Sequence, residues 1–335
     1  MQTPQNSSKL LTYWWNKGDN FGDVMNRELL EVLTGYSIEW SDDKDVPVFS
    51  AAGSIIDTFH TKPGWTIWGA GVISKNAGIP QNLDIRAVRG PKTRNHLLNN
   101  GYENIPEIYG DPGLLLPICF PQNNAQAEYD IGIIPHYAFR LHPAIHLYKF
   151  QREFRRTFRI GGMNRVQFIS PKLPVHLFLN KLTNCKAILA NSLHGLIVAM
   201  AYGIPCVWIH FANDPFEGRV TSPFEGDTFK YLDFLQSVGS SCTNPVLIRN
   251  TSDWKTAIDK LKDYEPVQFD PKPLLDAFPY KTASWSSWVA NWVWIPMPCW
   301  LASTTPQPRR RLPVWIRVVE TSAFVCARPS RSMTR

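Results

Sequence analysis

The sequence lacks the patterns that mark several specialised classes of protein. Its six cysteines contain no CxxC pair and no Cys/His spacing of a zinc site, so we expect no structural zinc and no disulfide scaffold. No apolar run reaches the ~18 residues of a membrane-spanning helix. The first ten residues have no apolar stretch either, so no secretory signal is predicted and a reducing cytoplasm fits. Gly69-Ala70-Gly71 lacks the third glycine of a dinucleotide fingerprint.

Excess positive charge is also absent from most of the chain. The formal net charge is +7, and the segment from Lys281 onward holds one Lys and seven Arg against one Glu. The rest is therefore neutral, which gives no support for a nucleic-acid partner. The same segment contains six of the 13 Trp and no lasting helical or strand periodicity. Two interpretations stay open for residues 283–335: an interfacial segment that contacts an anionic membrane, or a non-native extension.

The body of the chain alternates short apolar runs with amphipathic segments. Strands are expected at Leu11–Trp15, Val46–Ala51, Thr66–Trp68, Asp84–Val88, Ile131–Pro135, Val166–Ile169, Ala187–Ala190 and Cys206–Ile209. Helices are expected over Val24–Leu33, residues 91–100 and Leu193–Tyr202. In the first helix, Met25, Leu29, Val32 and Leu33 are predicted to share a buried face. This alternation predicts an α/β fold with parallel sheets.

The polar, proline-containing stretch 117–128 interrupts this pattern and is typical of a linker. It divides the body into an N-terminal Rossmann-like domain, residues 1–120, and a C-terminal Rossmann-like domain, residues 128–280. We expect the two domains to face a cleft, because ligands bind between such halves.

Two predicted strands are followed by polar residues and glycine. Asn20, Gly22 and Asp23 follow the first strand, and Gly53 with Ser54 follows the second. The carboxyl end of a strand, ahead of a helix N-terminus, is a natural anion or hydroxyl site, and glycine allows close approach of a ligand. The alternative is that these residues are ordinary helix caps and turn residues.

Cations surround the start of the predicted helix at Pro91. Arg86, Arg89, Lys92 and Arg94 lie where like charge is unfavourable with the helix dipole. A bound anion would explain this arrangement, since arginine forms a planar fork suited to carboxylate or phosphate. The alternative is a solvated face whose cations pair with nearby acids.

A histidine lies at another predicted strand-to-helix junction. His194, between Ser192 and Gly195, falls in a first helical turn, where free backbone N–H groups favour neutral imidazole and an adjacent anion. His136 follows its own strand and would face the same cleft. These positions suit proton transfer, although a lone histidine is commonly structural.

Seven segments occur here in one order: NFGD, a GS turn, WGAGV, DIRAVRGPKTR, EIYGDPGLLLP, IIPHY and NSLHGLIVAMAYGIP. Over residues 10–282 the chain resembles the polysaccharide pyruvyl transferase family. Thr66–Pro117 and Asp276–Tyr280 are most similar to the xanthan-type ketal pyruvyltransferase.

The resemblance implies a glycosyltransferase-B-like fold that moves pyruvyl from phosphoenolpyruvate to a sugar as a cyclic ketal. The family positions matched in this sequence are Asn20, Gly22, Asp23, Arg89, Asp111, His136, His194 and Gly195. Many members have arginine where this chain has Ser192, so that donor contact is absent or comes from another residue.

The two lines of reasoning meet in one scheme. His194 is the main acid/base, Arg89 holds the donor phosphate or carboxylate with Lys92 or Arg94 assisting, and Asp23 orients or deprotonates the acceptor hydroxyl. The scheme needs no metal and no cofactor beyond phosphoenolpyruvate as co-substrate. The expected acceptor is a lipid-linked oligosaccharide, with mannose as one candidate sugar, at the inner face of the plasma membrane.

Two other functions remain open on the sequence alone. One is a nucleotide-sugar-dependent glycosyltransferase on the same architecture, and the other is a non-catalytic anion-binding subunit of a polysaccharide assembly. The second shares the cations but does not need His194.

Overall fold

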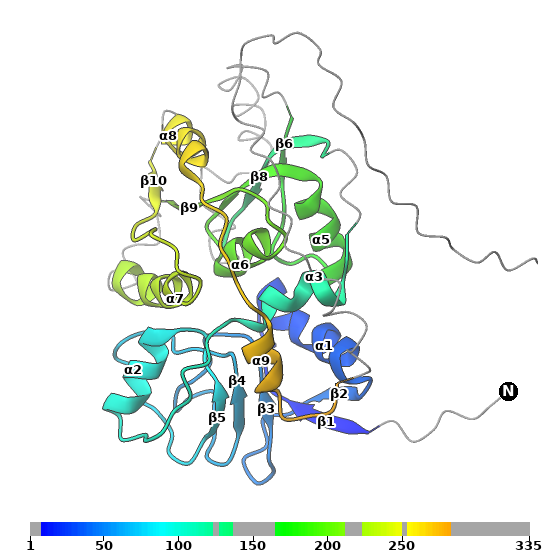
Figure 1. The fold of residues 1–335 in the computed structure, drawn as a ribbon, viewed down its shortest axis with the longest axis vertical. Helices are drawn as coiled ribbons and strands as arrows, with labels where there is room; N and C mark the ends of the chain where they lie inside the picture. The colour runs from blue at the N-terminus through cyan, green and yellow to red at the C-terminus, as the bar shows by residue number, and fades with distance from the viewer. Residues whose placement is uncertain (1–7, 123–126, 137–164, 212–222, 250–252, 283–335) are drawn as a thin grey trace, which may run out of the picture. The chain divides into compact units, whose positions relative to one another are not determined.

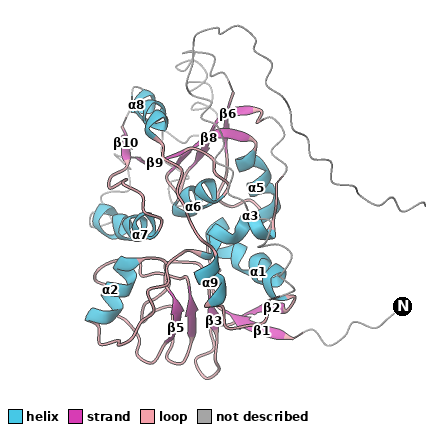
Figure 2. Cartoon of the chain, viewed as in Figure 1, coloured by secondary structure: helices cyan, strands magenta, loops and turns pink. Residues whose placement is uncertain are grey.

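The computed structural model describes residues 8–122, 127–136, 165–211, 223–249 and 253–282. The Trp- and Arg-rich segment 283–335 lies outside these residues. All described elements belong to one compact unit, residues 1–297. Strands and helices alternate along it (Figures 1 and 2).

The first half forms a five-stranded parallel sheet in the order β2-β1-β3-β4-β5. Its strands are β1 (Lys9–Thr12), β2 (Ser37–Trp40), β3 (Phe49–Ser50), β4 (Thr66–Trp68) and β5 (Asp84–Ala87). The helices along it are α1 (Phe21–Thr34), α2 (Pro91–Asn99), the 3-10 helix η1 (Pro112–Leu115) and α3 (Leu116–Cys119).

The second half forms another five-stranded parallel sheet, in the order β10-β9-β8-β6-β7. Its strands are β6 (Tyr129–Ile134), β7 (Val166–Phe168), β8 (Cys185–Ala190), β9 (Cys206–Phe211) and β10 (Val246–Ile248). The helices along it are α5 (Val175–Thr183), α6 (Leu193–Ala201), α7 (Pro223–Ser237) and α8 (Asp253–Lys260), followed by η4 (Leu261–Asp263) and α9 (Lys272–Asp276).

Both sheets have the same doubly wound strand order. In each, the first strand of the half lies between the second and the third, so the chain changes direction across the sheet at β1/β3 and at β6/β8. In open α/β sheets, ligands bind beyond the carboxyl ends of the strands at such switch points. The fold is therefore α/β and Rossmann-like, with two positions of this kind.

Apolar packing joins the two halves. One hydrophobic cluster contains buried residues of α1, α5 and α6, and the ring of Phe21 stacks on Phe178 at 3.9 Å between centroids. The backbone N–H of Phe21 also donates to the carbonyl of Pro171, which follows β7. The start of α1 is thus held by the second half of the chain.

The chain returns to the first sheet after α8. The Trp68 indole N–H donates to the carbonyl of Leu274 in α9 at 2.7 Å, and Phe278 packs on Trp68 and Phe49. Figure 1 shows α9 beside the strands of the first half. Residues 272–280, which we assigned to the second domain, therefore pack on the first sheet, and the proposed domain boundaries stay a prediction.

Every strand expected from the sequence is present, and β4 has the predicted bounds. The edge strands β2 and β10 were missed, because they are short and only partly buried and so carry weak apolar patterns. The buried face of α1 includes Leu30 and excludes Val32, which is 44% exposed. The start of the expected linker is helical, since Pro117 suits a first helical turn and Ile118 is buried in α3.

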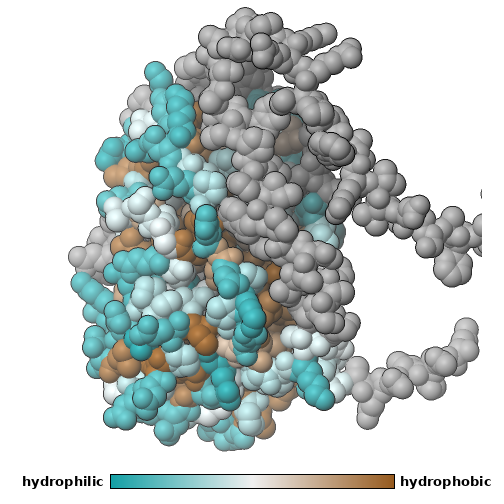
Figure 3. Space-filling model, in the orientation of Figure 1, coloured by the Kyte–Doolittle hydropathy of each residue, from teal (hydrophilic) through white to brown (hydrophobic). Residues whose placement is uncertain are grey.

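The surface drawn in Figure 3 intersperses hydrophobic with hydrophilic residues. The large hydrophobic side chains that are exposed in the described chain are Val32, Trp40, Phe59, Ile73 and Leu177. Among the described residues, no helix is both long enough and apolar enough to cross a bilayer.

Candidate functional site

The N-terminus of α6 positions His194 at the carboxyl end of β8. Ser192 is the N-cap, and its hydroxyl accepts a hydrogen bond from the backbone N–H of Gly195. A side chain at Gly195 would crowd Ile134 and Ala190, so glycine here lets α6 pack closely on β6 and β8. Ser192 and Gly195 thus set the position of the histidine.

The imidazole of His194 lies directly against α1. A Cβ added at Gly22 would overlap the ring atoms Nδ1, Cγ and Cε1 of His194. Gly22 belongs to the first half of the chain and His194 to the second. The absence of a side chain at Gly22 is therefore what allows the two switch points to meet at this residue.

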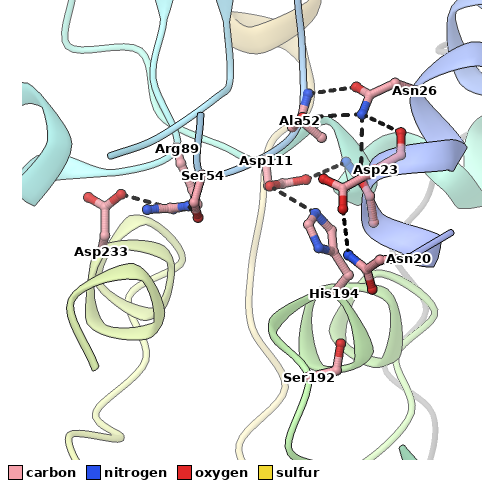
Figure 4. Close-up of polar contacts among 12 residues, drawn as sticks. Asn20, Asp23, Asn26, Ala52, Ser54, Arg89, Asp111, Ser192, His194 and Asp233 are labelled. Carbon is pink, nitrogen blue, oxygen red and sulfur yellow. Dashed lines mark hydrogen bonds and ion pairs between the residues drawn. The ribbon is translucent and has the colours of Figure 1, made fainter. Parts of the chain in front are cut away.

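Asp111 faces the other edge of the imidazole (Figure 4). Its Oδ2 lies 3.6 Å from His194 Nε2, too far for a hydrogen bond, while its Oδ1 accepts from the backbone N–H of Gly113 at 2.8 Å. Asp111 is fully buried, and the His194 side chain is 10% exposed. Neither Oδ2 nor Nε2 has a hydrogen-bond partner among the described residues. Buried polar atoms nearly always form hydrogen bonds, so these two atoms are available to bond a ligand or a water molecule.

Other buried polar atoms without a partner in the described chain lie at nearby strand ends. They are Thr12 Oγ1, Ser50 Oγ and Asn191 Nδ2, at or just beyond the carboxyl ends of β1, β3 and β8. Such strand ends form ligand sites in parallel sheets. Polar atoms without a hydrogen-bond partner in the described chain therefore lie at the strand ends where a ligand is expected to bind.

Asp23 is a buried carboxylate within electrostatic reach of His194. It is buried in the first turn of α1, and its Oδ2 accepts a hydrogen bond of 2.9 Å from the Asn20 side-chain amide. Burial raises the pKa of Asp23, while Asn20 and the positive charges of His194, Lys230 and His60 lower it only in part. A buried carboxyl with a raised pKa, in reach of histidine, is a candidate proton-transfer group.

Asn26 fastens this turn to the first sheet. Its side-chain amide donates to the carbonyls of Asp23 and Ala52, and its oxygen accepts from the Ala52 N–H at 2.8 Å. Ala52 follows β3, so Asn26 couples the segment carrying Asp23 to the loop that holds Gly53 and Ser54.

Arg89 lies in a second network, on the other side of that loop (Figure 4). Its side chain is fully buried, with Nε donating to Asp233 at 3.0 Å, Nη1 to the Ser54 hydroxyl and Nη2 to the Val72 carbonyl. Asp233 also accepts from the backbone and hydroxyl of Thr93 in α2. Asp233 is on α7, so this ion pair links α7 to the junction between β5 and α2.

Two further predicted residues, Arg94 and Gly53, make hydrogen bonds with parts of the chain other than His194. Arg94 donates to the Ile105 carbonyl and pairs with Glu107. Lys92 is half-buried in the first turn of α2, and His136 is half-buried two residues beyond β6. The carbonyl of Gly53 accepts from Gly71, next to the end of β4.

The sequence analysis missed Asp233 and Lys230, which lie one turn apart on α7. Both are buried, and Lys230 is within electrostatic reach of Asp23 and lies 5.5 Å from the Tyr231 ring centroid. The only sequence signal was two charged residues beside the apolar positions of a helix. The pairing of His60 with Asp57 likewise had no signal in the sequence. Within the described chain, no three His, Cys, Asp or Glu side chains are grouped as metal ligands.

Comparison with known proteins adds a family. Residues 41–211 match the family model for polysaccharide pyruvyl transferase. The uncharacterized protein L143 of Acanthamoeba polyphaga mimivirus is 25% identical over 245 residues, which cover 71% of this chain and 78% of that protein. The matched family range contains Ser54, Arg89, Asp111 and His194. The Asn20–Asp23 segment and α7 lie outside it but contact residues within it.

Proposed function

This chain belongs to the polysaccharide pyruvyl transferase family, and from that premise we propose that it transfers pyruvyl from phosphoenolpyruvate to two hydroxyls of one sugar, forming a cyclic ketal. The observation that carries the proposal is the buried His194–Asp111 pair with open hydrogen-bonding atoms, against Gly22 and beside Asp23. Ketal formation needs a proton donor and a group that binds the acceptor hydroxyl, and this arrangement supplies both types.

His194 is the proposed proton donor. Protonated at Nε2, it would be held by the Asp111 carboxylate on one edge, and it delivers the proton to the methylene carbon of the enol. The double bond of the donor is consumed and positive charge develops at C2. The buried carboxylate of Asp111, whose Oδ2 lies 3.6 Å from Nε2, would keep the ring oriented.

Asp23 is proposed to bind the attacking sugar hydroxyl, with Asn20 holding the carboxyl in place at 2.9 Å. The hydroxyl oxygen bonds to C2 and releases its proton. The C2–O bond to phosphate then breaks, and a second hydroxyl of the same sugar bonds to C2 and closes the ring, its proton passing to the departing phosphate. The products are the ketal and inorganic phosphate, so two C–O bonds form as one C–O bond and one π bond are lost.

The donor carries a phosphate and a carboxylate and needs cationic partners. Arg89, Lys92 and Arg94 remain the residues proposed from the sequence. Each of the three guanidinium nitrogens of Arg89 already donates to a protein acceptor, so we assign Lys230 as a further donor-binding cation. Lys230 is within electrostatic reach of Asp23 and, in this proposal, takes the place of the arginine that many family members carry at the position of Ser192.

The proposal extends to the acceptor sugar, the arrangement of the two halves and the place of the reaction in the cell. The acceptor is a sugar of an exopolysaccharide or its lipid-linked repeat unit, with mannose the first to test, as in the xanthan-type enzyme. The two Rossmann-like halves would form a glycosyltransferase-B-like pair around the substrate. The enzyme would work in the cytoplasm at the inner face of the plasma membrane.

The test is a product analysis. The full chain is incubated with phosphoenolpyruvate and a mannose-terminated oligosaccharide, and phosphate release and the NMR spectrum of the sugar are followed. We expect acceptor-dependent phosphate release and a new ketal methyl resonance. No such resonance with any acceptor, together with thermal stabilisation by a uridine or guanosine diphosphate, would instead identify a nucleotide-sugar glycosyltransferase.

A further inference from the structure

A second histidine–carboxylate pair lies in the loop after β3. His60 Nδ1 is 2.8 Å from Asp57 Oδ2 and 2.9 Å from Oδ1. The two side chains are mostly buried, with 20% of His60 and 12% of Asp57 exposed. A carboxylate at Nδ1 makes that nitrogen the donor and leaves Nε2 as the acceptor. In the described part of the chain, His60 Nε2 has no hydrogen-bond partner.

The loop holds this pair in a defined geometry. The second role of Asp57 is to accept hydrogen bonds of 2.8 Å from the backbone N–H groups of Phe59 and His60. Burial acts to raise the pKa of Asp57, but the hydrogen bonds and the charge of His60 outweigh it and lower the pKa. The carboxylate is thus ionised and fixed, and it orients the imidazole as in catalytic histidine–carboxylate pairs.

Three aromatic side chains surround the imidazole of His60, with Tyr13 the most distant at 6.3 Å between centroids. The Trp15 and Phe59 rings lie 5.1 Å and 4.8 Å from it, both edge to face. Phe59 is 69% exposed, more than any other exposed large hydrophobic residue in the described chain. The negative face of an aromatic ring attracts the polarised C–H groups of a sugar ring. An exposed ring beside an available nitrogen suits a ligand with one apolar face and several hydroxyls.

This surface adjoins the candidate site. Trp15 lies in the loop between β1 and α1 that also carries Asn20 and Asp23, and β1 and β3 are neighbouring strands. The ring of Tyr13, the residue after β1, also lies 6.3 Å from the His60 ring between centroids. His60 and Asp23 therefore lie at the same switch point of the first sheet, where the acceptor would have to approach.

We infer that Trp15, Phe59 and the Asp57–His60 pair form the acceptor-sugar subsite, in which His60 Nε2 takes the proton from the attacking hydroxyl. This inference rests on the proposed function for its chemistry. The hydroxyl oxygen bonds to C2 of the protonated donor, and its proton moves to Nε2 of His60, which then releases it to solvent. Phe59 and Trp15 hold the sugar ring, and Asp57 positions the imidazole.

The experiment combines sugar binding with kinetics, on the full chain. Binding of methyl glycosides of mannose, glucose and galactose is first measured by saturation-transfer NMR without phosphoenolpyruvate. We expect binding to wild type and its loss or weakening in Phe59→Ala. With donor present, Phe59→Ala should raise the acceptor KM about 2- to 10-fold, the range of an aromatic contact. His60→Gln should lower kcat by about 10²-fold or more, with the donor KM unchanged.

Matched controls come from α5. His176→Gln and Leu177→Ala alter an exposed histidine and a 44% exposed leucine and should change neither kcat nor either KM. Kinetics of His60→Gln and Phe59→Ala within twofold of wild type would overturn the subsite, as would failure of wild type to bind any of the sugars. Sugar binding that depends on Phe59, without ketal formation from phosphoenolpyruvate, would retain the subsite and refute the proposed function instead.

Discussion

Two buried polar groups at the strand ends differ in how completely their atoms are bonded. Arg89 and Asp233 form a charge pair in which the guanidinium nitrogens and both carboxylate oxygens have protein partners. His194 and Asp111 are as deeply placed, yet the facing atoms Nε2 and Oδ2 have none among the described residues. Both pairs join the first half of the chain to the second.

The difference separates a structural role from a chemical one. A satisfied charge pair already has its hydrogen bonds and gains little from a ligand, so its effect is to fix α7 against the junction of β5 and α2. A buried pair with open atoms carries a desolvation cost that a ligand or water can remove. Hydrogen bonds from His194 and Asp111 to a bound transition state would offset this desolvation cost.

The comparison is tested most strongly by His194→Gln. Glutamine keeps a polar side chain of similar length but cannot transfer a proton, so we expect kcat to fall by about 10²- to 10⁴-fold. The free energy of unfolding, measured by urea denaturation, should stay near that of wild type because the open atoms contribute little to stability. His176→Gln, on the exposed surface of α5, serves as the control. A stability loss that matches the activity loss would make His194 structural.

The opposite pattern is expected for Arg89→Met. Removing one partner leaves the buried Asp233 carboxylate uncompensated, and we expect a loss of about 3–5 kcal/mol in the free energy of unfolding. The double variant Arg89→Met with Asp233→Leu should recover much of this loss, because no unpaired charge remains. Unchanged stability with a raised KM for phosphoenolpyruvate would instead make Arg89 the anion ligand that its position in the sequence suggested.

Gly22→Ala tests the contact between the open pair and α1. The added methyl group must displace the His194 imidazole, and a misplacement of about 1 Å can cost about 10²-fold in rate. We therefore expect kcat to fall ~10- to 100-fold, measured by phosphate release. Gly35→Ala is the control, since Gly35 has φ +71° and open space around it. It should lower stability through backbone strain and leave kcat unchanged.

Much of the site around His194 could be predicted from the sequence. His194, Asp23 and Gly22 each follow an apolar strand and begin a helix, so a local pattern placed them at strand ends. In the structure Gly22 lies directly against the His194 imidazole, and Asp111 Oδ2 lies 3.6 Å from His194 Nε2. The same local pattern located the cations around Pro91, for which the sequence offered either a bound anion or pairing with nearby acids on a solvated face.

The identity of that anion could not be predicted. Asp233 is 144 residues from Arg89 along the chain, and nothing in either segment specifies the pairing. Arg89 does pair with an acid of the chain itself, but the pair is fully buried and does not lie on the solvated face that the sequence alternative described. His60 and Asp57 were missed for another reason: their loop has neither helical nor strand periodicity, and the packing of Tyr13 and Trp15 on His60 reveals their place.

The smallest expected effect concerns how Asp23 contributes to stability. Burial raises the pKa of Asp23 in the folded protein above the ordinary aspartate value of 3.8, so the native state holds this proton more tightly than the unfolded chain. As pH rises from 3.8 through the native pKa, the unfolded state ionises first, and this carboxyl lowers the free energy of unfolding. Asp23→Asn removes that penalty.

The stability of the Asp23→Asn variant relative to wild type should therefore increase across this pH window and then level off, as measured by urea denaturation at a series of pH values. Asp57, with its lowered pKa, provides the opposite case, because its contribution is lost as pH falls. A relative stability of Asp23→Asn that decreases with rising pH would mean that Asp23 is held as a carboxylate, and it would place Asp23 with the satisfied groups such as Asp233.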